Sequence, residues 1–539
     1  MHSRERIFSC ITNTMGTYID RGNVDFAQAR NSTYVDKSGL IAVINETLFT
    51  EQRRSCVTRS RRFGKSMAAN MLCAYYDRSC DSRALFADLE IAKAPSFEKY
   101  LNKFPVIKLD LTDFTTDYKD NPDIISVMQE KLKEDVRRAY PGIVPDDFKD
   151  GFMDMLISIN QATGDSFIMV IDEWDAICRE FEPKSKVMDS FVNWLRRMFK
   201  GSNTMKVFAG VYMTGILPIK KYKTESALNN FMEYSVTSPM NMARYFGFTR
   251  GEVKKLCEAK GRNFSEMEQW YDGYKIGLEP SIFNPNSVMM ALSAGYCRSF
   301  WAKTGAYDQV ATYIDMNYEG LKDDIIYMLS GGRCDVETNG FGNDMNIVRS
   351  KDEVLTVLIH LGYLAYDFEE EKCYIPNYEV RREMENAVKS SGWQVAQAIT
   401  GSKKLLEATL AGDSDYVAQA IDKAHDENTS ILSYNNENSL ACVLTIAYLY
   451  AQNDYVVHRE LATGKGFADL VLIPRKNIDK PAIVLELKFN QDVEAAIDQI
   501  RRRTYVGRVA QHTGDILLVG ISYDKKEKTH SCAKEKVHI

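Results

Sequence analysis

The feature that most constrains the fold is a run at residues 167–171 that is apolar at every position. Two acidic residues, Asp172 and Glu173, follow it directly. A strand with one solvated face alternates apolar and polar side chains, so this run needs protein cover on both faces. Other strand-length runs occur before and after it, and segments with helical spacing of apolar side chains separate them. This alternation predicts an α/β domain with a parallel sheet enclosed by helices. The predicted strands are 55–58, 104–111, 167–171 and 207–213, and the predicted helices are 38–49, 65–76, 124–140, 146–159 and 185–199.

The rest of the chain changes character twice. From about residue 239 to 430 the apolar spacing is mostly helical, and the last part follows the order α-β-β-β-α-β. We therefore expect a sheet domain in residues 1–240, a helical lid or linker in 241–430, and a compact α/β unit in 431–539. The helices predicted beyond the first part are 252–261, 286–293, 350–360, 380–389, 437–450 and 491–505, and the strands are 455–458, 467–473, 482–489 and 516–521.

The composition is that of an ordinary globular protein. Of 539 residues, 45% are hydrophobic and 26% are charged, which excludes collagen-like and mainly disordered chains. The longest apolar stretch, 440–451, is well short of the ~20 residues that span a bilayer, and no apolar segment follows the charged start. We therefore expect no membrane contact and no secretory signal. The 11 Cys form no C-x-x-C pair and the 7 His are dispersed, which predicts reduced thiols, a cytoplasmic location and no zinc site.

The first candidate site is a phosphate site at Gly64, Lys65 and Ser66, between a predicted strand and a predicted helix. Such a turn offers backbone N–H groups and a helix N-terminus to anionic oxygens. Lys65 would reach the β- and γ-phosphates of a nucleotide, and the Ser66 hydroxyl would bind Mg²⁺. The pattern G-x-x-x-x-G-K-[ST] is incomplete, because Arg59 stands at its first glycine. The three residues alone are also consistent with an ordinary helix start.

The carboxylates after the buried run favour the nucleotide interpretation. Asp172 would hold the metal ion and Glu173 would polarise the attacking water, although an acidic helix cap is the alternative. The ends of parallel strands meet at the edge where α/β sheets bind ligands, so these acids are expected beside the glycine–lysine turn. Thr214 ends the next strand and would sense the γ-phosphate, or simply close a turn. Arg61 and Arg62 flank the turn and would contact phosphate, or form a solvated basic turn.

The second candidate site is a metal-dependent nuclease site in the last part of the chain. Asp469 lies on one predicted strand, and Glu486 and Lys488 lie on the next. Alternation places Glu486 and Lys488 on the same face, and charged groups within an apolar strand are costly to bury unless they are paired or bind metal. Two carboxylates from a hairpin would hold Mg²⁺, and the lysine would orient a water for attack on a phosphodiester. An edge hairpin with one solvated face is the alternative.

More distant groups would support this second site. Glu437, which opens a predicted helix, and Glu460, which ends a predicted strand, would add metal-binding carboxylates. The net charge of −6 gives no global attraction to nucleic acid, so any contact needs a local patch. Residues 499–508 carry arginines and a tyrosine and would contact phosphates, or form a solvated helix face.

At these residues the chain resembles the bacterial predicted AAA-ATPases, in which an AAA-ATPase-like domain is fused to a C-terminal domain of the PD-(D/E)XK nuclease superfamily. Within the family, Arg-Arg-Phe-Gly-Lys-Ser is the usual form of the phosphate turn, so the missing first glycine fits the resemblance. The chain departs from the superfamily name at Ala468, where that name has proline. The resemblance rests on Tyr34-Val35-Asp36-Lys37 and on residues 61–66, 171–175, 246–249, 270–274, 283–285, 361–364, 375–377, 463–466, 469 and 486–488.

The resemblance implies a P-loop NTPase sheet, a helical middle and a restriction-endonuclease-like α/β domain, with ATP and Mg²⁺ as cofactors. It also implies a nuclease that cleaves or processes DNA under the control of ATP, and it permits a homo-oligomer. Two alternatives stay open: a nucleotide-dependent switch or scaffold that binds nucleic acid or protein without cutting, and an ATPase that hydrolyses slowly. The implied ATPase residues are Lys65, Ser66, Asp172 and Glu173, and the implied nuclease residues are Asp469, Glu486 and Lys488 with Glu437 and Glu460 in support.

Overall fold

The computed structural model divides the chain into two compact units. The first comprises Met1–Lys303 and Asp335–Val380, and the second comprises Thr304–Cys334 and Arg381–Ile539. The structure describes residues 16–145, 147–182, 185–219, 228–301, 312–313, 318–329, 331–341, 348–390, 395–427, 444, 447–463, 466–474, 478–502 and 515–538.

A five-stranded parallel sheet forms the centre of the first unit, as the apolar runs predict. Its order is β2-β3-β4-β1-β5, and every neighbouring pair is parallel. The order places β3 beside β4 and β4 beside β1, so the carboxyl ends of these strands lie along one edge of the sheet. The strands are β1 (Arg54–Thr58), β2 (Val106–Asp110), β3 (Phe167–Asp172), β4 (Phe208–Gly215) and β5 (Met232–Tyr234).

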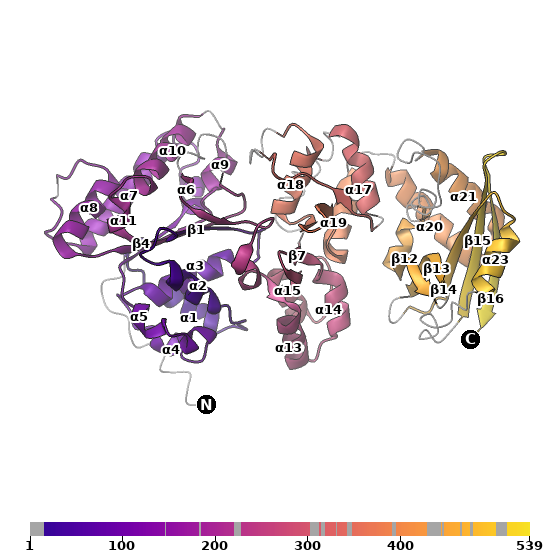
Figure 1. Ribbon diagram of the computed structural model, residues 1–539, viewed down its shortest axis with the longest axis horizontal. Coiled ribbons are helices and arrows are strands. Elements are labelled where there is room, and N and C mark those ends of the chain that lie inside the picture. Colours follow the sequence, from indigo (N-terminus) through magenta and orange to yellow (C-terminus); the bar gives the residue numbers. More distant parts are fainter. Residues whose placement is uncertain are drawn as a thin grey trace. The chain divides into compact units, whose positions relative to one another are not determined.

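Helices cover both faces of this sheet (Figure 1), which explains why β3 is apolar throughout. Ile168 and Val170 pack into the core under α1 to α5, whereas Met169 and Ile171 pack into the core under α6 to α10. The first group is α1 (Val24–Arg30), α2 (Gly39–Thr47), α3 (Lys65–Tyr76), α4 (Arg83–Phe86) and α5 (Phe97–Tyr100). The second is α6 (Leu111–Asp117), α7 (Ile124–Ala139), α8 (Phe152–Thr163), α9 (Ala176–Glu180), α10 (Lys186–Phe199) and α11 (Thr204–Val207).

The predicted helix 146–159 begins later than expected, as α8 at Phe152. Gly151 is extended at the helix start, and its backbone N–H donates to Asp154 Oδ2 at 3.1 Å. Aspartate at this position satisfies a backbone donor that the first turn leaves without a helical partner. The apolar spacing runs past this boundary, so it does not reveal the start.

The middle of the chain is mainly helical, as predicted, but it also contains short strands. One three-stranded antiparallel sheet has the order β6-β8-β7, and β10 and β11 form a hairpin. The helices are α13 (Arg250–Lys260), α14 (Phe264–Tyr271), α15 (Pro285–Ala294), α18 (Lys351–Leu361) and α19 (Tyr378–Ser390). The strands are β6 (Phe248–Thr249), β7 (Tyr274–Ile276), β8 (Glu279–Phe283), β10 (Ala365–Asp367) and β11 (Lys372–Tyr374).

The second unit is built on a mixed five-stranded sheet, β12-β13-β14-β15-β16, in which only β14 and β15 are parallel. Helix α23 connects that parallel pair, and its Ile497 and Ile500 pack on one face of the sheet. Residues of α20 and α21 pack on the other face. The elements are α17 (Leu321–Leu329), α20 (Val395–Ala411), α21 (Ser414–Glu427), β12 (Tyr455–Thr463), β13 (Gly466–Pro474), β14 (Ala482–Phe489), α23 (Val493–Arg502), β15 (Asp515–Asp524) and β16 (Thr529–His538).

No helix in the described part of the chain combines the length and the apolar character that crossing a membrane requires.

Candidate functional site

The turn between β1 and α3 has the backbone that a phosphate site needs. Gly64, the N-cap residue before α3, has φ +91° and no side chain to cap the first N–H groups of the helix. A Cβ added to Gly64 would meet nothing within 4 Å, so the space beside the turn is open. The left-handed backbone, rather than crowding, therefore requires glycine at this position.

Arg59, at the first glycine of the phosphate pattern, is wholly buried. Its Nη1 donates to the carbonyls of Thr58 and Tyr234, both at 2.8 Å, and its guanidinium lies 5.2 Å from the ring centre of Phe246. Burial lowers the pKa of Arg59 to about 10. The side chain thus joins the turn to β5 and to the segment before β6, a structural role that the sequence pattern did not reveal.

The structure brings Ser66 and Asp172 together at the edge of the sheet, as expected. Asp172 ends β3 with 1% of its surface exposed, and the Ser66 side chain lies beside it. Burial raises the pKa of Asp172 to about 6, Ser66 opposes that rise, and the nearby Asp110 and Glu173 add to it. A buried carboxylate with a hydroxyl beside it is a suitable oxygen-ligand set for a hard divalent cation.

Lys65 and Glu173 also meet at this edge. The Lys65 side chain is 4% exposed, its Nζ donates to the Ser60 carbonyl at 3.2 Å, and it lies 3.5 Å from Glu173 Oε1. Glu173 has φ +49°, a left-handed conformation that is uncommon outside glycine and that recurs at functional sites. The lysine, the turn and the acids are therefore assembled as the sequence predicts.

Thr214 lies beside the same acids, in β4. Its carbonyl accepts the Trp174 N–H at 2.8 Å, so it is close to the turn that follows β3. Its side chain is wholly buried, and within the described part of the chain its hydroxyl has no hydrogen-bond partner. An unsatisfied buried hydroxyl is costly, so Thr214 is suited to donate to an acceptor atom of a bound ligand.

Glu173 belongs to a network of ion pairs with Arg179 and Asp175 that the sequence analysis did not predict. Arg179 Nη2 lies 2.6 Å from Glu173 Oε2, and Arg179 Nε lies 3.3 Å from the wholly buried Asp175. Asp175 in turn accepts the N–H of Leu217 at 3.0 Å. Burial raises the pKa of Asp175 and Arg179 opposes the rise, whereas the two carboxylates raise the pKa of Arg179 above its usual value despite its burial. The spacing of Asp175 and Arg179 by four was the available signal.

The two flanking arginines lie in the turn that precedes Gly64. Arg61 is half-buried, and Arg62 is exposed with φ +67°. Arg62 Nη1 donates to the Phe300 carbonyl at 3.4 Å, so this contact ties the turn to the middle of the chain. The structure thus places both arginines next to the turn, without a contact that assigns either one to phosphate.

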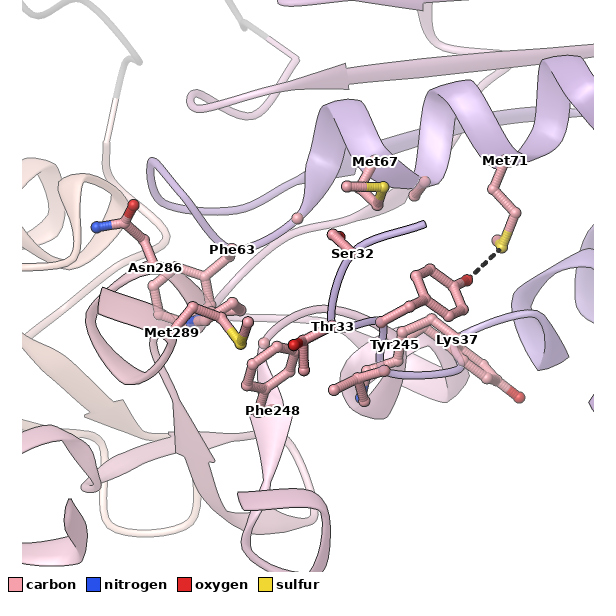
Figure 2. Close-up of a pocket in the computed structure, with 16 residues that line it drawn as sticks. Ser32, Thr33, Lys37, Phe63, Met67, Met71, Tyr245, Phe248, Asn286 and Met289 are labelled. Carbon is pink, nitrogen blue, oxygen red and sulfur yellow. Dashed lines mark hydrogen bonds between the residues drawn. The ribbon is translucent and has the colours of Figure 1, made fainter. Parts of the chain in front are cut away.

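A cavity of about 320 Å³ opens directly beside Gly64 (Figure 2). Its walls come from segment 32–37, the first turns of α3, segment 245–248 and the start of α15. Met67 and Met71 of α3 face Tyr245, Phe248 and Met289 across it, so the lining is mainly apolar and aromatic. A flat aromatic group bound here would lie next to the phosphate turn.

The Tyr34–Lys37 motif forms one wall of this cavity and is held firmly. Tyr34 donates its hydroxyl to Met71 Sδ at 3.6 Å, and Lys37 Nζ lies 2.7 Å from a Glu252 carboxylate oxygen. Asp36 accepts the backbone N–H of Glu90 at 2.7 Å. Burial lowers the pKa of Lys37 and Glu252 opposes this. The motif therefore fixes the cavity wall rather than supplying a reactive group.

In the second unit, Glu486 and Lys488 lie on one face of β14, as alternation predicts. Glu486 is 2% exposed, and Lys488 Nζ donates to its Oε1 at 3.3 Å. Gln499 of α23 donates its side-chain N–H to the same oxygen, a contact that the sequence interpretation missed. Asp469 precedes Leu470 in β13, and Leu470 pairs with Leu485, so the backbones of Asp469 and Glu486 lie on neighbouring strands.

For two of the predicted nuclease residues the structure describes the backbone alone. Glu460 lies in β12 and Asp469 in β13, and only their backbones are described. Glu437 and the basic residues 503–508 lie outside the described residues. Their assignment to the second site stays a prediction.

Comparison with known proteins finds a family match in the first part of the chain and another in the last part. Residues 22–224 match the family described as predicted AAA-ATPase, and residues 435–532 match the PD-(D/E)XK nuclease superfamily. No curated protein matches the chain.

Two solved structures from Aeropyrum pernix are similar at low identity. The ORC2 protein, solved in ADPNP-ADP complexes, is 11% identical, with a TM-score of 0.32 over 67% of this chain and 98% of that one. The ORC1 protein, solved in complex with DNA, is 12% identical, with a TM-score of 0.25 over 69% of this chain and 97% of that one. The family matches thus carry the assignment, which the resemblance had predicted: the chain joins a domain of the predicted AAA-ATPase family to a domain of the PD-(D/E)XK nuclease superfamily.

Proposed function

We propose that the protein is an ATP-dependent, Mg²⁺-requiring nuclease that binds nucleotide at the Gly64–Ser66 turn and cuts nucleic acid, with DNA as the first candidate, at its C-terminal sheet. The observation that carries the proposal is the convergence of Lys65, Asp172 and Glu173 on one edge of the parallel sheet. A cytoplasmic location, a bacterial origin and self-association stay predictions.

The residues at the first site fit a triphosphate with a divalent cation. Uncapped N–H groups at the start of α3 and Lys65 would bind phosphate oxygens, while Ser66 and Asp172 would hold Mg²⁺. When bound, the cation neutralises charge on the transferred phosphoryl group. Glu173 would orient the attacking water, and the partnerless Thr214 hydroxyl would donate to the terminal phosphate. Arg61 and Arg62 would supply additional positive charge.

The cavity beside Gly64 would take the nucleoside part of the same ligand. Its lining is mainly apolar and aromatic, its volume of about 320 Å³ exceeds that of a purine, and it adjoins the phosphate turn. Bases stack on aromatic side chains with a favourable energy of about 1–3 kcal/mol. Tyr245 and Phe248 provide such surfaces (Figure 2).

The second site would act on a phosphodiester. Burying Glu486 in an apolar strand is costly unless the charge has partners, and Lys488 and Gln499 supply two of them. Glu486 and Asp469, with Glu437 and Glu460 in support, would hold Mg²⁺, and Lys488 would orient the attacking water. A divalent cation supplies charge stabilisation of the developing oxyanion at such sites.

Nucleotide binding is tested on the full chain with a fluorescent ATP analogue. Lys65→Ala removes the phosphate-binding ammonium and is expected to weaken binding at least tenfold, a change of about 1.4 kcal/mol. Lys254→Ala, on the exposed side of α13, is the matched control and should bind like the wild type. Equal affinities for all three proteins would remove the assignment.

Nuclease activity is tested by conversion of a supercoiled plasmid in the presence of Mg²⁺ and ATP. Glu486→Gln should abolish cleavage, because it removes a charged metal ligand while keeping the side-chain volume. Glu494→Gln, exposed on α23, is the control and should leave cleavage unchanged.

A binding switch without cleavage is the second candidate function. The net charge of −6 provides no general attraction to a nucleic-acid substrate, which favours a protein or structured partner. If the wild type binds nucleotide but cleaves neither plasmid nor single-stranded DNA at any Mg²⁺ or Mn²⁺ concentration, the switch is the better assignment.

A further inference from the structure

Glu173 shares its carboxylate between two cations, unequally. Its Oε2 lies 2.6 Å from Arg179 Nη2, whereas its Oε1 lies 3.5 Å from Lys65 Nζ. Charge-assisted N–H···O bonds are about 2.7–2.9 Å long, so only the contact to Arg179 is a close one. The arginine therefore holds the carboxylate more tightly than the lysine does.

Arg179 is itself fixed. Its side chain is 14% exposed, and its Nε lies 3.3 Å from Asp175, which is wholly buried. The Asp175 carboxylate accepts backbone N–H groups from Ile216 and Leu217, directly after β4. The guanidinium thus lies between two carboxylates, Asp175 on one side and Glu173 on the other, and its ion pair with Glu173 is the shorter of the two.

The ammonium group of Lys65 can either form a close ion pair with Glu173 or bind the phosphates of a nucleotide, but not both at once. In the structure the Lys65 ammonium donates to the Ser60 carbonyl and lies 3.5 Å from Glu173 Oε1. The side chain is 4% exposed, so a full ion pair with Glu173 would be strong and would compete directly with phosphate oxygens. The position of Glu173 therefore decides whether the lysine is available.

We propose that Arg179 is a positioning residue that draws Glu173 away from Lys65 and so keeps the lysine available for the phosphates of a bound nucleotide. The inference rests on the proposed nucleotide binding at the Gly64–Ser66 turn. It adds a residue that touches neither phosphate nor metal and acts only through Glu173.

A double-mutant cycle on the full chain tests this. The affinity for ADP with Mg²⁺ is measured by calorimetry for the wild type, Arg179→Met, Glu173→Gln and the double variant. In Arg179→Met the glutamate turns to Lys65, and binding weakens about tenfold, since neighbouring charges couple by roughly 0.5–3 kcal/mol. Glu173→Gln removes the competing charge and binds at least as tightly as the wild type. The double variant binds like Glu173→Gln alone.

A purely structural role for Arg179 gives a different pattern. The loss would then not depend on Glu173, so the double variant would bind as weakly as Arg179→Met, and the inference would be overturned. An unchanged affinity in Arg179→Met overturns it as well. If Arg179→Met fails to fold, the Glu173→Gln variant alone tests the inference. Weaker ADP binding by Glu173→Gln than by the wild type would show that Glu173 does not compete with phosphate for Lys65.

Two controls separate this inference from the proposed function. Arg381→Met removes another guanidinium paired four residues along a helix, to Glu385 at 2.8 Å with 12% exposure, and should not change ADP affinity. Wild-type protein that binds no ADP, or that binds it as well as Lys65→Ala does, overturns nucleotide binding itself. If the wild type binds ADP tightly but the double variant binds as weakly as Arg179→Met, only the role of Arg179 is overturned.

Discussion

At the scale of single residues, a left-handed backbone ties the phosphate turn to one residue type. Gly64 has φ +91°, and its neighbours leave open space where a side chain would project. A side chain there would cost about 1–2 kcal/mol through the backbone alone. This residue directly precedes the first N–H groups of α3, so stability and phosphate binding are both expected to depend on its φ angle.

Gly64→Ala is expected to lower stability by about 1–2 kcal/mol and to weaken nucleotide binding more than tenfold. Gly251→Ala is the matched control, because Gly251 lies in α13 at an ordinary φ with nothing within 4 Å of an added Cβ. That change should stabilise the helix by about 0.5–1 kcal/mol. Thermal unfolding and nucleotide titration of both variants check this, and equal effects at the two glycines would contradict it.

Glu233 makes stability depend on pH. Burial raises its pKa from 4.5 to about 7, although its carboxylate accepts the Ile219 N–H at 2.6 Å. Because the folded pKa lies above the unfolded one, the charged form is penalised in the folded state. The penalty is absent below pH 4.5, grows as the pH rises to 7, and then stays at up to about 3 kcal/mol.

Glu233→Gln keeps the acceptor for Ile219 and removes the charge. The variant should be more stable than the wild type at pH 8 and nearly equal to it at pH 4.5, as measured by urea unfolding at both values. A difference that stays the same at the two pH values would show that the charge is not the cause.

At the scale of elements, the parallel strands follow from the sequence because burial on both faces leaves an uninterrupted apolar run. β3, which packs into two cores, shows this most clearly. β6, with two residues, and β7, with three, are too short to show alternation, and they form through pairing with β8. Helix starts such as that of α8 depend on one cap, which apolar spacing does not record.

Some residues of the candidate sites could be predicted from the sequence and others could not. Lys65, Ser66 and Asp172 could be predicted together, because strand ends of a parallel sheet meet at one edge. Arg179 and Gln499 could not, because each acts through a contact whose geometry depends on how a helix is set against a strand. The spacing of Asp175 and Arg179 by four signals their own ion pair, but neither it nor Gln499 alone signals the contact with a strand-end carboxylate.

The start of α13 gives a prediction at this scale. Thr249 and Glu252 form a capping box, in which the Thr249 N–H donates to Glu252 at 2.7 Å. Glu252 also pairs with Lys37, so the cap connects α13 to the wall of the cavity. Thr249→Ala should cost about 1 kcal/mol and Thr249→Ser much less, as measured by thermal unfolding. Equal losses would show that the hydroxyl does not cap the helix.

At the scale of the whole molecule, the C-terminal sheet depends on helices that precede the predicted boundary at residue 431. Leu405 and Leu406 of α20 and Val417 and Ile421 of α21 are each at most 2% exposed and share a core with β13, β14 and β15. In addition, Asp422 of α21 accepts from the His530 backbone N–H at 2.8 Å. One face of the sheet is therefore covered by residues that lie outside the segment 431–539.

A fragment of residues 431–539 should consequently fold poorly, whereas one of residues 395–539 should be soluble and unfold cooperatively. Burying a leucine, valine or isoleucine contributes about 1.5–3 kcal/mol each, so removing four such side chains costs an amount comparable with the whole stability of a domain, about 5–15 kcal/mol. Dye binding to exposed apolar surface and thermal unfolding of the two fragments measure the difference. The variant Leu406→Asp in the longer fragment should also be destabilised, because it places a charged side chain in this core without shortening the chain. If the short fragment proves as stable as the long one, the sheet folds independently and α20 and α21 do not stabilise it.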